Sequence, residues 1–257
     1  MKNEIQRYIY QTIEDDGAML FYLIDPADGN VEENAKRGIN AAKAGVDLIL
    51  IGGSVGAQGE ILDDTIKIIK DETGIPVVLF PGNIATISKY ADAIYFMNLL
   101  NSRDPYWLST AQMCSAPVIA RYGIEPIPTT YLVAEPGMAV GWVGDVRLLP
   151  RNKEYISQMC ALAGQYLGSK LLVIDSGSGA PEPVPTSLIS AVKKVIEIPL
   201  IIGGGIKTLD QAKDIILAGA DCIQVGSVFE KNMGIEFIRS FVEGVKRAGK
   251  EKKERSD

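Results

Sequence analysis

Short, almost continuous apolar runs recur along this chain, and each is followed by a segment of mixed polarity. An apolar run of about four to eight residues predicts a strand that is buried on both faces, as in a parallel sheet. Eight such runs are present, at 18–24, 48–51, 76–80, 93–97, 129–134, 171–174, 199–202 and 222–225.

The segments between these runs have the period of a helix. Their apolar residues recur at intervals of three and four, and glycine often ends the segment, as at a helix C-cap. The predicted helices are 31–45, 60–74, 152–168, 186–195 and 209–220. Alternating strands and helices predict an α/β fold with a parallel sheet, and eight units favour a (β/α)8 TIM barrel over an open doubly wound sheet.

Three connections depart from this regular alternation. Only GNIATISKYAD separates the third run from the fourth, which predicts an irregular or missing helix after strand 3 and a gap in the outer ring. Residues 98–128 and 135–151 form long connections that contain Trp107 and Trp142. Long loops after strands lie at the catalytic face of such barrels, so we expect both to face the substrate.

Length and composition fit one cytoplasmic domain. The 257 residues, 47% of them apolar, are typical of a single TIM-barrel domain over 1–257, and we expect the charged tail 246–257 to be a frayed helix end. The first residues are too polar for a signal peptide, and no apolar run reaches the length of a membrane span. Three widely spaced cysteines without a CxxC pair favour a reducing cytosol.

Net charge and histidine content restrict the possible partners and catalytic groups. A net charge of −6 argues against nucleic acid as a partner. The chain contains no histidine, which excludes histidine general bases, Ser–His triads and histidine-bound metals. Any bound phosphate must therefore be held locally, by backbone amides, a metal ion or a few lysines.

Three glycine-bearing segments, 173–181, 200–208 and 223–229, each contain the end of a predicted strand. Glycine lets successive N–H groups surround an anion, so these segments predict a phosphate clamp at strands 6–8. Asp175 could accept a hydroxyl proton there, or could form an Asx turn that stabilises the loop. The candidate binding residues are Val173, Ile174, Asp175, Ser176, Gly177, Ser178, Gly179, Gly203, Gly204, Gly205, Gly226 and Ser227.

Asp25 and Ser54 follow the first and second predicted strands. In a barrel these strand ends are neighbours, and their oxygen atoms are the ligands that Mg²⁺ prefers. Asp25 could instead be a turn residue before proline, and Ser54 a helix or turn cap. Their position beside a phosphate site favours a metal site.

Taken together and in order, eight segments resemble the geranylgeranylglyceryl phosphate synthases, to which the bacterial heptaprenylglyceryl phosphate synthases are related. The resemblance extends from about Gly17 to Gly249. The segments are LIDP (23–26), GVDLILIGGS (45–54), PVVLFPGN (76–83), ADAIYFMNLLNSRDPYW (91–107), EPIPTTYLVAEPG (125–137), DSGSGAPEPV (175–184), IIGGGI (201–206) and QVGSVFE (224–230).

The resemblance implies a Mg²⁺-dependent barrel enzyme of ether-lipid synthesis. Such an enzyme joins geranylgeranyl diphosphate to sn-glycerol 1-phosphate and releases 3-O-geranylgeranyl-sn-glyceryl 1-phosphate and diphosphate, the first committed step toward archaeal membrane lipids. It implies that Asp25 and Ser54 hold Mg²⁺, that the glycine segments bind glycerol phosphate, and that the protein is a homo-oligomer with at most transient membrane contact.

Two positions depart from the family pattern. Val173-Ile174-Asp175 stands where the family usually has Tyr-Leu-Glu, and DPADG lacks the lysine that many members carry after the proline. Lys207 is a candidate for a compensating cation. A prenyl chain also needs an apolar groove, which we expect near the gap after strand 3; the aromatic candidates for its lining, each of which could equally belong to the core, are Tyr95, Phe96, Tyr106, Trp107 and Tyr131.

Two other functions fit a barrel with a phosphate clamp. One is a phosphosugar isomerase or lyase, whose pocket would close over a small sugar. The other is a non-catalytic barrel that binds a phosphorylated metabolite as a regulator, which the altered strand 6 end would support. An apolar groove leading out of the pocket would distinguish a prenyltransferase from an isomerase.

Overall fold

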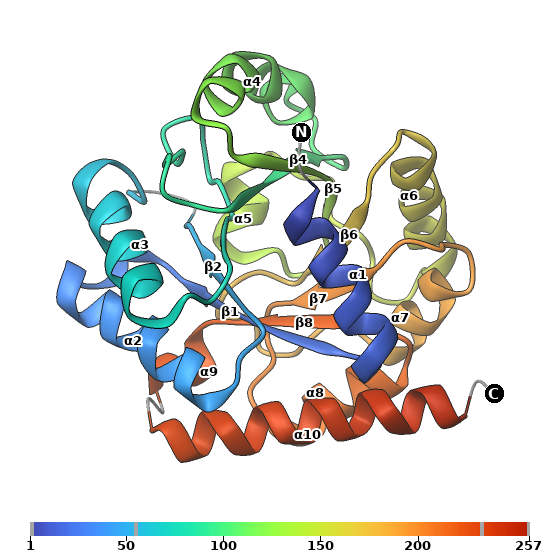
Figure 1. The fold of residues 1–257 in the computed structure, drawn as a ribbon. Coiled ribbons are helices and arrows are strands. Elements are labelled where there is room, and N and C mark those ends of the chain that lie inside the picture. Colours follow the sequence, from blue (N-terminus) through green and yellow to red (C-terminus); the bar gives the residue numbers. More distant parts are fainter. Residues whose placement is uncertain (1–2, 54–55, 232–233, 256–257) are drawn as a thin grey trace.

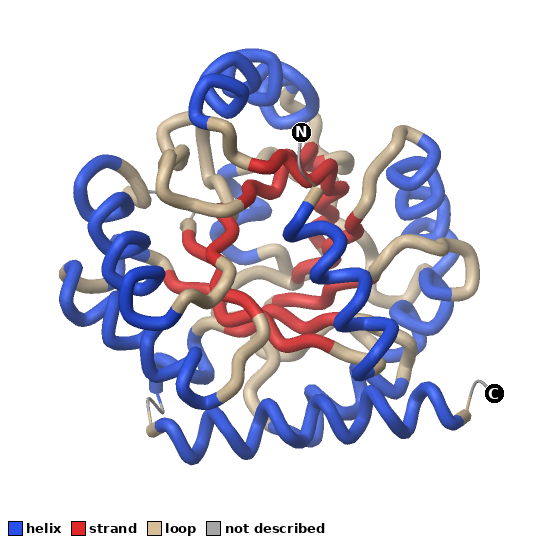
Figure 2. Tube along the Cα trace, in the orientation of Figure 1, coloured by secondary structure: helices blue, strands red, loops and turns tan. Residues whose placement is uncertain are grey.

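The computed structural model describes residues 3–53, 56–231 and 234–255. Eight parallel strands are hydrogen-bonded in chain order, and the eighth pairs with the first, so the sheet closes into a barrel with helices outside it (Figures 1 and 2). The predicted (β/α)8 barrel is therefore confirmed. The strands are β1 (Met19–Ile24), β2 (Leu48–Ile51), β3 (Val77–Leu79), β4 (Ala93–Leu99), β5 (Glu125–Val133), β6 (Leu171–Asp175), β7 (Leu200–Gly203) and β8 (Cys222–Val225).

The helices of the described residues include all five that the sequence predicts, with ends that agree to within three residues. Two short helical turns, η1 and η2, lie after β1 and β4. The bounds are α1 (Glu4–Asp16), η1 (Pro26–Asp28), α2 (Val31–Ala44), α3 (Gly59–Thr73), η2 (Tyr106–Thr110), α4 (Ala111–Tyr122), α5 (Met138–Val143), α6 (Glu154–Tyr166), α7 (Thr186–Lys193), α8 (Leu209–Leu217), α9 (Ser227–Lys231) and α10 (Ile235–Glu254).

Alternation along each strand divides the core into two layers. On β1, Met19 and Phe21 belong to the cluster inside the barrel, whereas Leu20 and Tyr22 pack outward against the helices. Both sets are fully buried. Each strand therefore appears in the sequence as a continuous apolar run, because neither of its faces meets water.

No helix connects β3 to β4. Residues 80–92, all of them described, form turns and irregular backbone. The predicted gap after strand 3 is therefore confirmed. Its physical cause is length, because thirteen residues that must also return to the barrel bottom leave no room for a crossover helix of ordinary size.

Helix α1 closes the amino-terminal end of the barrel (Figure 1, blue) and was not among the predicted helices. Its Ile9 is fully buried in the inner cluster. The Glu125 carboxylate accepts hydrogen bonds from the backbone N–H groups of Ile5 (2.9 Å) and Gln6 (2.8 Å). This acid satisfies the open end of the helix and complements its dipole, although it lies more than a hundred residues away in sequence.

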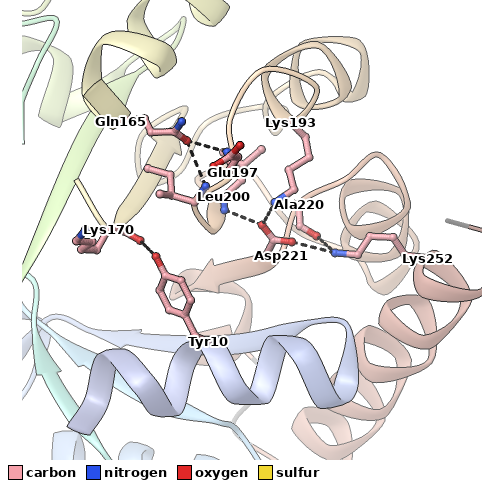
Figure 3. Close-up of polar contacts among 10 residues, drawn as sticks. Tyr10, Gln165, Lys170, Lys193, Glu197, Leu200, Ala220, Asp221 and Lys252 are labelled. Carbon is pink, nitrogen blue, oxygen red and sulfur yellow. Dashed lines mark hydrogen bonds and ion pairs between the residues drawn. The ribbon is translucent and has the colours of Figure 1, made fainter. Parts of the chain in front are cut away.

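The charged tail is an ordered helix through Glu254, so the prediction of a frayed end is wrong for residues 246–254. Lys246 Nζ lies 2.6 Å from Asp47 Oδ1 and 2.9 Å from Asp16 Oδ2. Lys252 Nζ donates to the Ala220 carbonyl oxygen at 2.7 Å and lies 3.3 Å from Asp221 (Figure 3). Charged residues of α10 thus bind partners at the barrel's amino-terminal face, which a count of charges cannot reveal.

The long connections are more ordered than expected. Residues 98–128 contain η2, α4 and the start of β5, and residues 135–151 contain α5. Strand β5 begins at Glu125, four residues before the predicted start. The sequence pattern did not reveal this first part because proline, here at 126 and 128, is uncommon inside strands. Pairing of β5 with β6 begins only at Thr129, so these prolines lie in the part of β5 that has not yet reached β6.

The described helices include none that is long and apolar enough to cross a membrane.

Candidate active site

One continuous cavity lies at the carboxyl ends of the strands and has three parts. Glycine loops after β6, β7 and β8 form the first part, and an acidic corner formed by Asp25, Asp28 and Glu230 is the second. The third is an apolar branch between the segment after β3 and helices α4 and α5. No lysine or arginine appears among the described residues that line it. The described lining therefore offers an anion backbone N–H groups and neutral polar side chains.

The glycine loop after β7 requires glycine for two separate reasons. Gly204 and Gly205 have φ angles of +77° and +72°, in the left-handed region that other residues rarely adopt. A Cβ on Gly204 would overlap Asp175 Oδ1 and lie 2.7 Å from the Gly177 nitrogen. The loops after β6 and β7 thus approach each other closely, and both line the cavity through Ser178, Gly179 and these glycines.

Asp175 is buried at the end of β6, where it forms the Asx turn that the sequence allowed. Its Oδ1 accepts from the Gly177 N–H at 2.6 Å, which is the Asx turn, and its side chain also lines the cavity. Burial raises the pKa of this carboxyl, against hydrogen bonds from Gly177, Gln224 and Tyr131 that lower it. A buried carboxylate with a raised pKa is a better proton acceptor than an exposed one.

The remaining candidates for the phosphate clamp lie in different places. Gly226 and Ser227 line the cavity at the end of β8. Val173 packs inside the barrel and Ile174 packs outward against the helices, so neither side chain reaches the cavity. Ser176, Gly177 and Gly203 do not line it but support those that do: Gly203 leaves room for Asp175 and Gln224, since a Cβ there would lie 2.7 Å from each.

Gln224 is a cavity residue that the sequence analysis did not include. It is 3% exposed, lines the cavity from β8, and donates from Nε2 to Asp175 Oδ2 at 3.1 Å. The available signal was its position, because Gln224 is the one polar residue in the apolar run CIQV. A polar side chain in a strand buried on both faces must find a polar partner.

Asp25 begins η1, where its Oδ1 accepts from the Ala27 N–H at 3.0 Å. Burial raises its pKa to about 6, the Ala27 hydrogen bond opposes that rise, and the nearby acids Asp28 and Glu230 add to it. A Cβ on Gly53 would overlap the Asp25 carboxylate, so the end of β2 packs directly on it. Ser54, the other predicted metal ligand, lies outside the described residues.

The acidic corner fits Mg²⁺. The described residues include no group of three or more histidine, cysteine or acidic side chains with the geometry of a metal cage. Mg²⁺ needs no such cage, because it binds through one or two carboxylates and completes its shell with water and substrate phosphates. Asp28 and Glu230 add to the raised pKa of Asp25, beside a cavity whose described lining contains no lysine or arginine, and a bound cation would offset this concentration of negative charge.

Aromatic side chains line the apolar branch. Tyr95, Phe96, Trp107 and Tyr131 line it, and the ring centroid of Phe80 lies 5.7 Å from that of Tyr95 and 5.4 Å from that of Tyr131. Tyr106 does not line the cavity, but its ring packs edge-on against Trp107. Residues from the gap after β3, including Ile84 and Ile87, form the other wall, so the branch runs past the missing helix.

Lys207 does not supply a cation to the cavity. Its Nζ donates to the Pro181 carbonyl oxygen at 2.7 Å, and its side chain is exposed and not part of the lining. Arg151 similarly donates to the Pro183 carbonyl oxygen at 2.8 Å. These two basic residues therefore hold the loop after β6 from outside.

Comparison with known proteins identifies the family. The model of the PcrB family matches residues 11–245. The chain belongs to the PcrB family. It is 48% identical over 243 residues to geranylgeranylglyceryl phosphate synthase of Pyrococcus horikoshii, with 95% of each chain covered. It is 47% identical over 247 residues to the enzyme of that name from Thermococcus kodakarensis, covering 96% of this chain and 98% of the relative. The family resemblance stated from the sequence is confirmed.

Solved structures agree with this assignment. The fold matches (S)-3-O-geranylgeranylglyceryl phosphate synthase from Thermoplasma acidophilum, in complex with its substrate sn-glycerol-1-phosphate, with a TM-score of 0.91 at 37% identity; 95% of this chain and 98% of that one are covered. The enzyme from Thermoplasma volcanium matches with a TM-score of 0.85 at 40% identity, covering 92% and 95%. A thiamine phosphate pyrophosphorylase from Pyrococcus furiosus, at 16% identity and a TM-score of 0.56, shares the fold alone.

Proposed function

We propose that this protein is a geranylgeranylglyceryl phosphate synthase. It transfers the geranylgeranyl group from its diphosphate to sn-glycerol 1-phosphate, and releases 3-O-geranylgeranyl-sn-glyceryl 1-phosphate and diphosphate. One observation carries the proposal: a single cavity joins glycine loops suited to a phosphate, an acidic corner suited to Mg²⁺, and an apolar branch suited to a prenyl chain. The names of the relatives support it.

The glycine loops are the site for the acceptor phosphate. The described lining offers neither lysine nor arginine, so the backbone N–H groups around Gly204, Gly205 and Gly226 are the proposed hydrogen-bond donors to the anion. Ser227 adds a hydroxyl at the start of α9. With the phosphate held here, the glycerol hydroxyl groups extend toward Asp175, at the end of the neighbouring strand β6.

Asp25, with Ser54, is the proposed ligand of Mg²⁺ on the prenyl diphosphate side. When bound, the metal ion supplies positive charge to the departing diphosphate. Asp25 can ligate only in its ionised form, and its pKa of about 6 leaves it mostly ionised at neutral pH. The neighbouring Asp28 and Glu230 increase the local negative charge and so favour occupation by a cation.

The residues of the barrel position the two reactants. The C3 hydroxyl oxygen of glycerol phosphate forms a bond to C1 of the prenyl group, while the bond between C1 and the diphosphate oxygen breaks and diphosphate keeps the electron pair. The hydroxyl proton passes to Asp175. Because an ordinary alcohol is far less acidic than a carboxyl, this transfer becomes favourable only as the new carbon–oxygen bond forms. Most of the rate enhancement is then expected from positioning.

We further propose that the protein is a homo-oligomer in the cytoplasm. Several large apolar side chains are exposed, among them Trp142 at 86%, Tyr166 at 79% and Tyr155 at 71%. Contact with a second copy of the chain would bury these side chains, which supports association. The three cysteines are free, which supports a reducing compartment. Light scattering on the purified chain would determine its mass in solution.

The alternatives from the sequence receive less support. A phosphosugar isomerase or lyase closes over a small polar substrate, whereas the apolar branch here leads away from the phosphate loops past the gap after β3. The N-acetylmannosamine-6-phosphate 2-epimerase of Clostridium perfringens shares only the fold, at 14% identity. A regulatory phosphate binder would need neither the apolar branch nor Asp25 with its raised pKa.

The test is a turnover assay with Mg²⁺, sn-glycerol 1-phosphate and labelled geranylgeranyl diphosphate. Wild type should produce label that is extractable into organic solvent, and Asp25→Asn should lose it. Asp175→Ala should lose most of it while retaining glycerol phosphate binding. Absence of product from wild type with any prenyl chain length, despite measurable glycerol phosphate binding, would contradict the proposal and favour a regulatory binder.

A further inference from the structure

Gln224 lines the cavity and carries a buried acceptor, Oε1, without a hydrogen-bond partner among the described residues. On β8, Cys222 lies inside the barrel and Ile223 outside it, so the alternation places the Gln224 side chain inside, at the end nearer the cavity. Its Oε1 is buried and accepts no hydrogen bond from any group in the described part of the chain. Buried polar atoms in folded proteins are nearly always paired, so an orphan on a residue that lines a cavity is a candidate partner for a donor on the bound ligand.

The orientation of the amide is fixed by its neighbour. Gln224 Nε2 lies 3.1 Å from Asp175 Oδ2. An ionised carboxylate only accepts hydrogen bonds, so the NH₂ group of the amide must face it and Oε1 must point elsewhere. Rotating the amide would place two acceptors against each other. The orphan acceptor is therefore held in place by Asp175.

We propose that Gln224 binds the acceptor substrate directly, its Oε1 accepting a hydrogen bond from the C2 hydroxyl of glycerol phosphate while Asp175 receives the C3 hydroxyl. The inference rests on the proposed function and adds a substrate contact to it. Asp175 and Gln224 are hydrogen-bonded neighbours at the ends of β6 and β8, and together they offer two adjacent acceptors. Two adjacent acceptors match the two adjacent hydroxyl groups of a vicinal diol.

This assignment has a consequence for specificity. A site built to hydrogen-bond a hydroxyl group rejects the analogue that lacks it, because a buried acceptor is then left unpaired. Propane-1,3-diol 1-phosphate has the phosphate and the reacting hydroxyl but lacks the C2 hydroxyl. The wild-type enzyme should discriminate against it through Gln224.

The decisive experiment compares two enzymes, each with two acceptor substrates. The kcat/KM of wild type and of Gln224→Met is measured with sn-glycerol 1-phosphate and with propane-1,3-diol 1-phosphate at saturating geranylgeranyl diphosphate. Wild type should prefer sn-glycerol 1-phosphate, which has the C2 hydroxyl, by about 10-fold or more in kcat/KM. In Gln224→Met, which has similar length but no acceptor, that preference should fall to within about 2-fold.

The ratio of the two kcat/KM values distinguishes a direct substrate contact by Gln224 from an indirect role in positioning Asp175. If Gln224 only positions Asp175, Gln224→Met lowers kcat/KM for both acceptors by the same factor and the preference is unchanged, which overturns the proposal. Cys222→Ala is the matched control, since Cys222 is a buried, inward-facing residue of the same strand that does not line the cavity. It should keep the wild-type preference whatever it does to stability.

Calorimetry keeps the inference testable if the variant does not fold. Wild type alone should bind sn-glycerol 1-phosphate more tightly than propane-1,3-diol 1-phosphate by a similar factor, and equal affinities would overturn the contact. This measurement also tests the Gln224 contact separately from prenyl transfer. A wild type that binds the two ligands unequally but transfers no prenyl group would contradict the proposed function and leave the Gln224 contact supported.

Discussion

Asp175 and Asp25 show how surroundings assign different tasks to one residue type. Asp175 is buried, with hydrogen bonds to its carboxylate from Gly177 and Gln224, which suits a base held in one geometry. Asp25 is half-buried beside other acids, which raises its pKa to about 6 and suits a cation ligand. Hydrogen-bond donors stabilise the first carboxylate, whereas the second has fewer of them, which is consistent with the metal ligand proposed above.

The raised pKa of Asp25 predicts a pH-dependent penalty in the metal-free protein. Because the folded pKa of about 6 lies above the model value of 3.8, this group contributes stability at low pH that is lost as pH rises through 6. Asp25→Asn should therefore melt at a higher temperature than wild type at pH 7.5 without Mg²⁺, and the difference should shrink at pH 4.5. Adding Mg²⁺ at pH 7.5 should raise the melting temperature of wild type only.

Thermal melts at the two pH values with and without MgCl₂ measure this effect. An equal difference between wild type and Asp25→Asn at both pH values would show that ionisation of Asp25 carries no cost in the fold.

Gly204→Ala should damage the phosphate loop. Its Cβ would combine a φ of +77° with overlap of the Asp175 carboxylate, so the loops after β6 and β7 must separate. We expect glycerol phosphate binding to weaken by at least about 10-fold, since one strained left-handed residue costs about 1–2 kcal/mol before the clash is added. Gly74→Ala is the control, with a similar φ of +66° and no atom within 4 Å of its Cβ. It should lose stability but bind normally by calorimetry.

At the scale of elements, ion pairs fix α10 against the amino-terminal face of the barrel. The 20-residue helix packs Phe241 and Val245 into the outer core while Lys246 reaches Asp47. Asp47 also accepts from the Leu20 N–H at 2.8 Å, and so joins the start of β1 to the last helix. Lys193 of α7 lies 2.5 Å from Asp221 of the same face (Figure 3).

Lys246→Met should destabilise the protein through the charge that it leaves behind. The Asp47 side chain is 9% exposed, and removing one partner of a buried pair costs about 3–5 kcal/mol. Adding Asp47→Asn, which keeps an oxygen acceptor for Leu20, should recover most of that loss. Urea unfolding of the two single variants and the double variant measures the coupling. Additive losses would mean that the two side chains do not act as a pair.

At the scale of the whole molecule, the missing helix between β3 and β4 provides the space for the apolar branch. A complete ring of helices would cover the side of the barrel where Ile87, Phe96 and Ser115 line the cavity. The barrel therefore lacks a helix at the place where a long apolar ligand needs room. The phosphate loops, on the far side of the barrel mouth, keep the complete strand–helix pattern.

Filling this branch should change chain-length preference. Ser115 lies on α4 and lines the branch, so Ser115→Trp should lower kcat/KM for geranylgeranyl diphosphate by at least about 10-fold while a shorter prenyl diphosphate is used nearly as well as before. Ala116→Trp is the matched control, because Ala116 is exposed and not part of the lining. Competition between diphosphates of two lengths, read by product chromatography, measures the shift. Equal losses for both lengths would place the prenyl chain elsewhere.

The sequence by itself determined the barrel, its gap and the positions of the glycine loops after β7 and β8. Strands such as β2 and β8 were located to the residue because burial on both faces makes a parallel strand continuously apolar. The gap after β3 followed from the length of the connection. Gly204 and Gly205 were identifiable because residues other than glycine rarely adopt their backbone conformation, so the sequence itself indicates it.

Only the tertiary structure decided which polar groups meet. Gln224 joins Asp175 from forty-nine residues away, Glu125 stabilises the start of α1, and Lys246 pairs with Asp47 across the molecule. Periodicity reports whether a face is buried and local spacing reports turns, but neither reports which distant side chains share a site. Strands β6 and β8 both pair with β7, and this arrangement places the lone glutamine of an apolar strand beside Asp175, which makes it a candidate substrate contact.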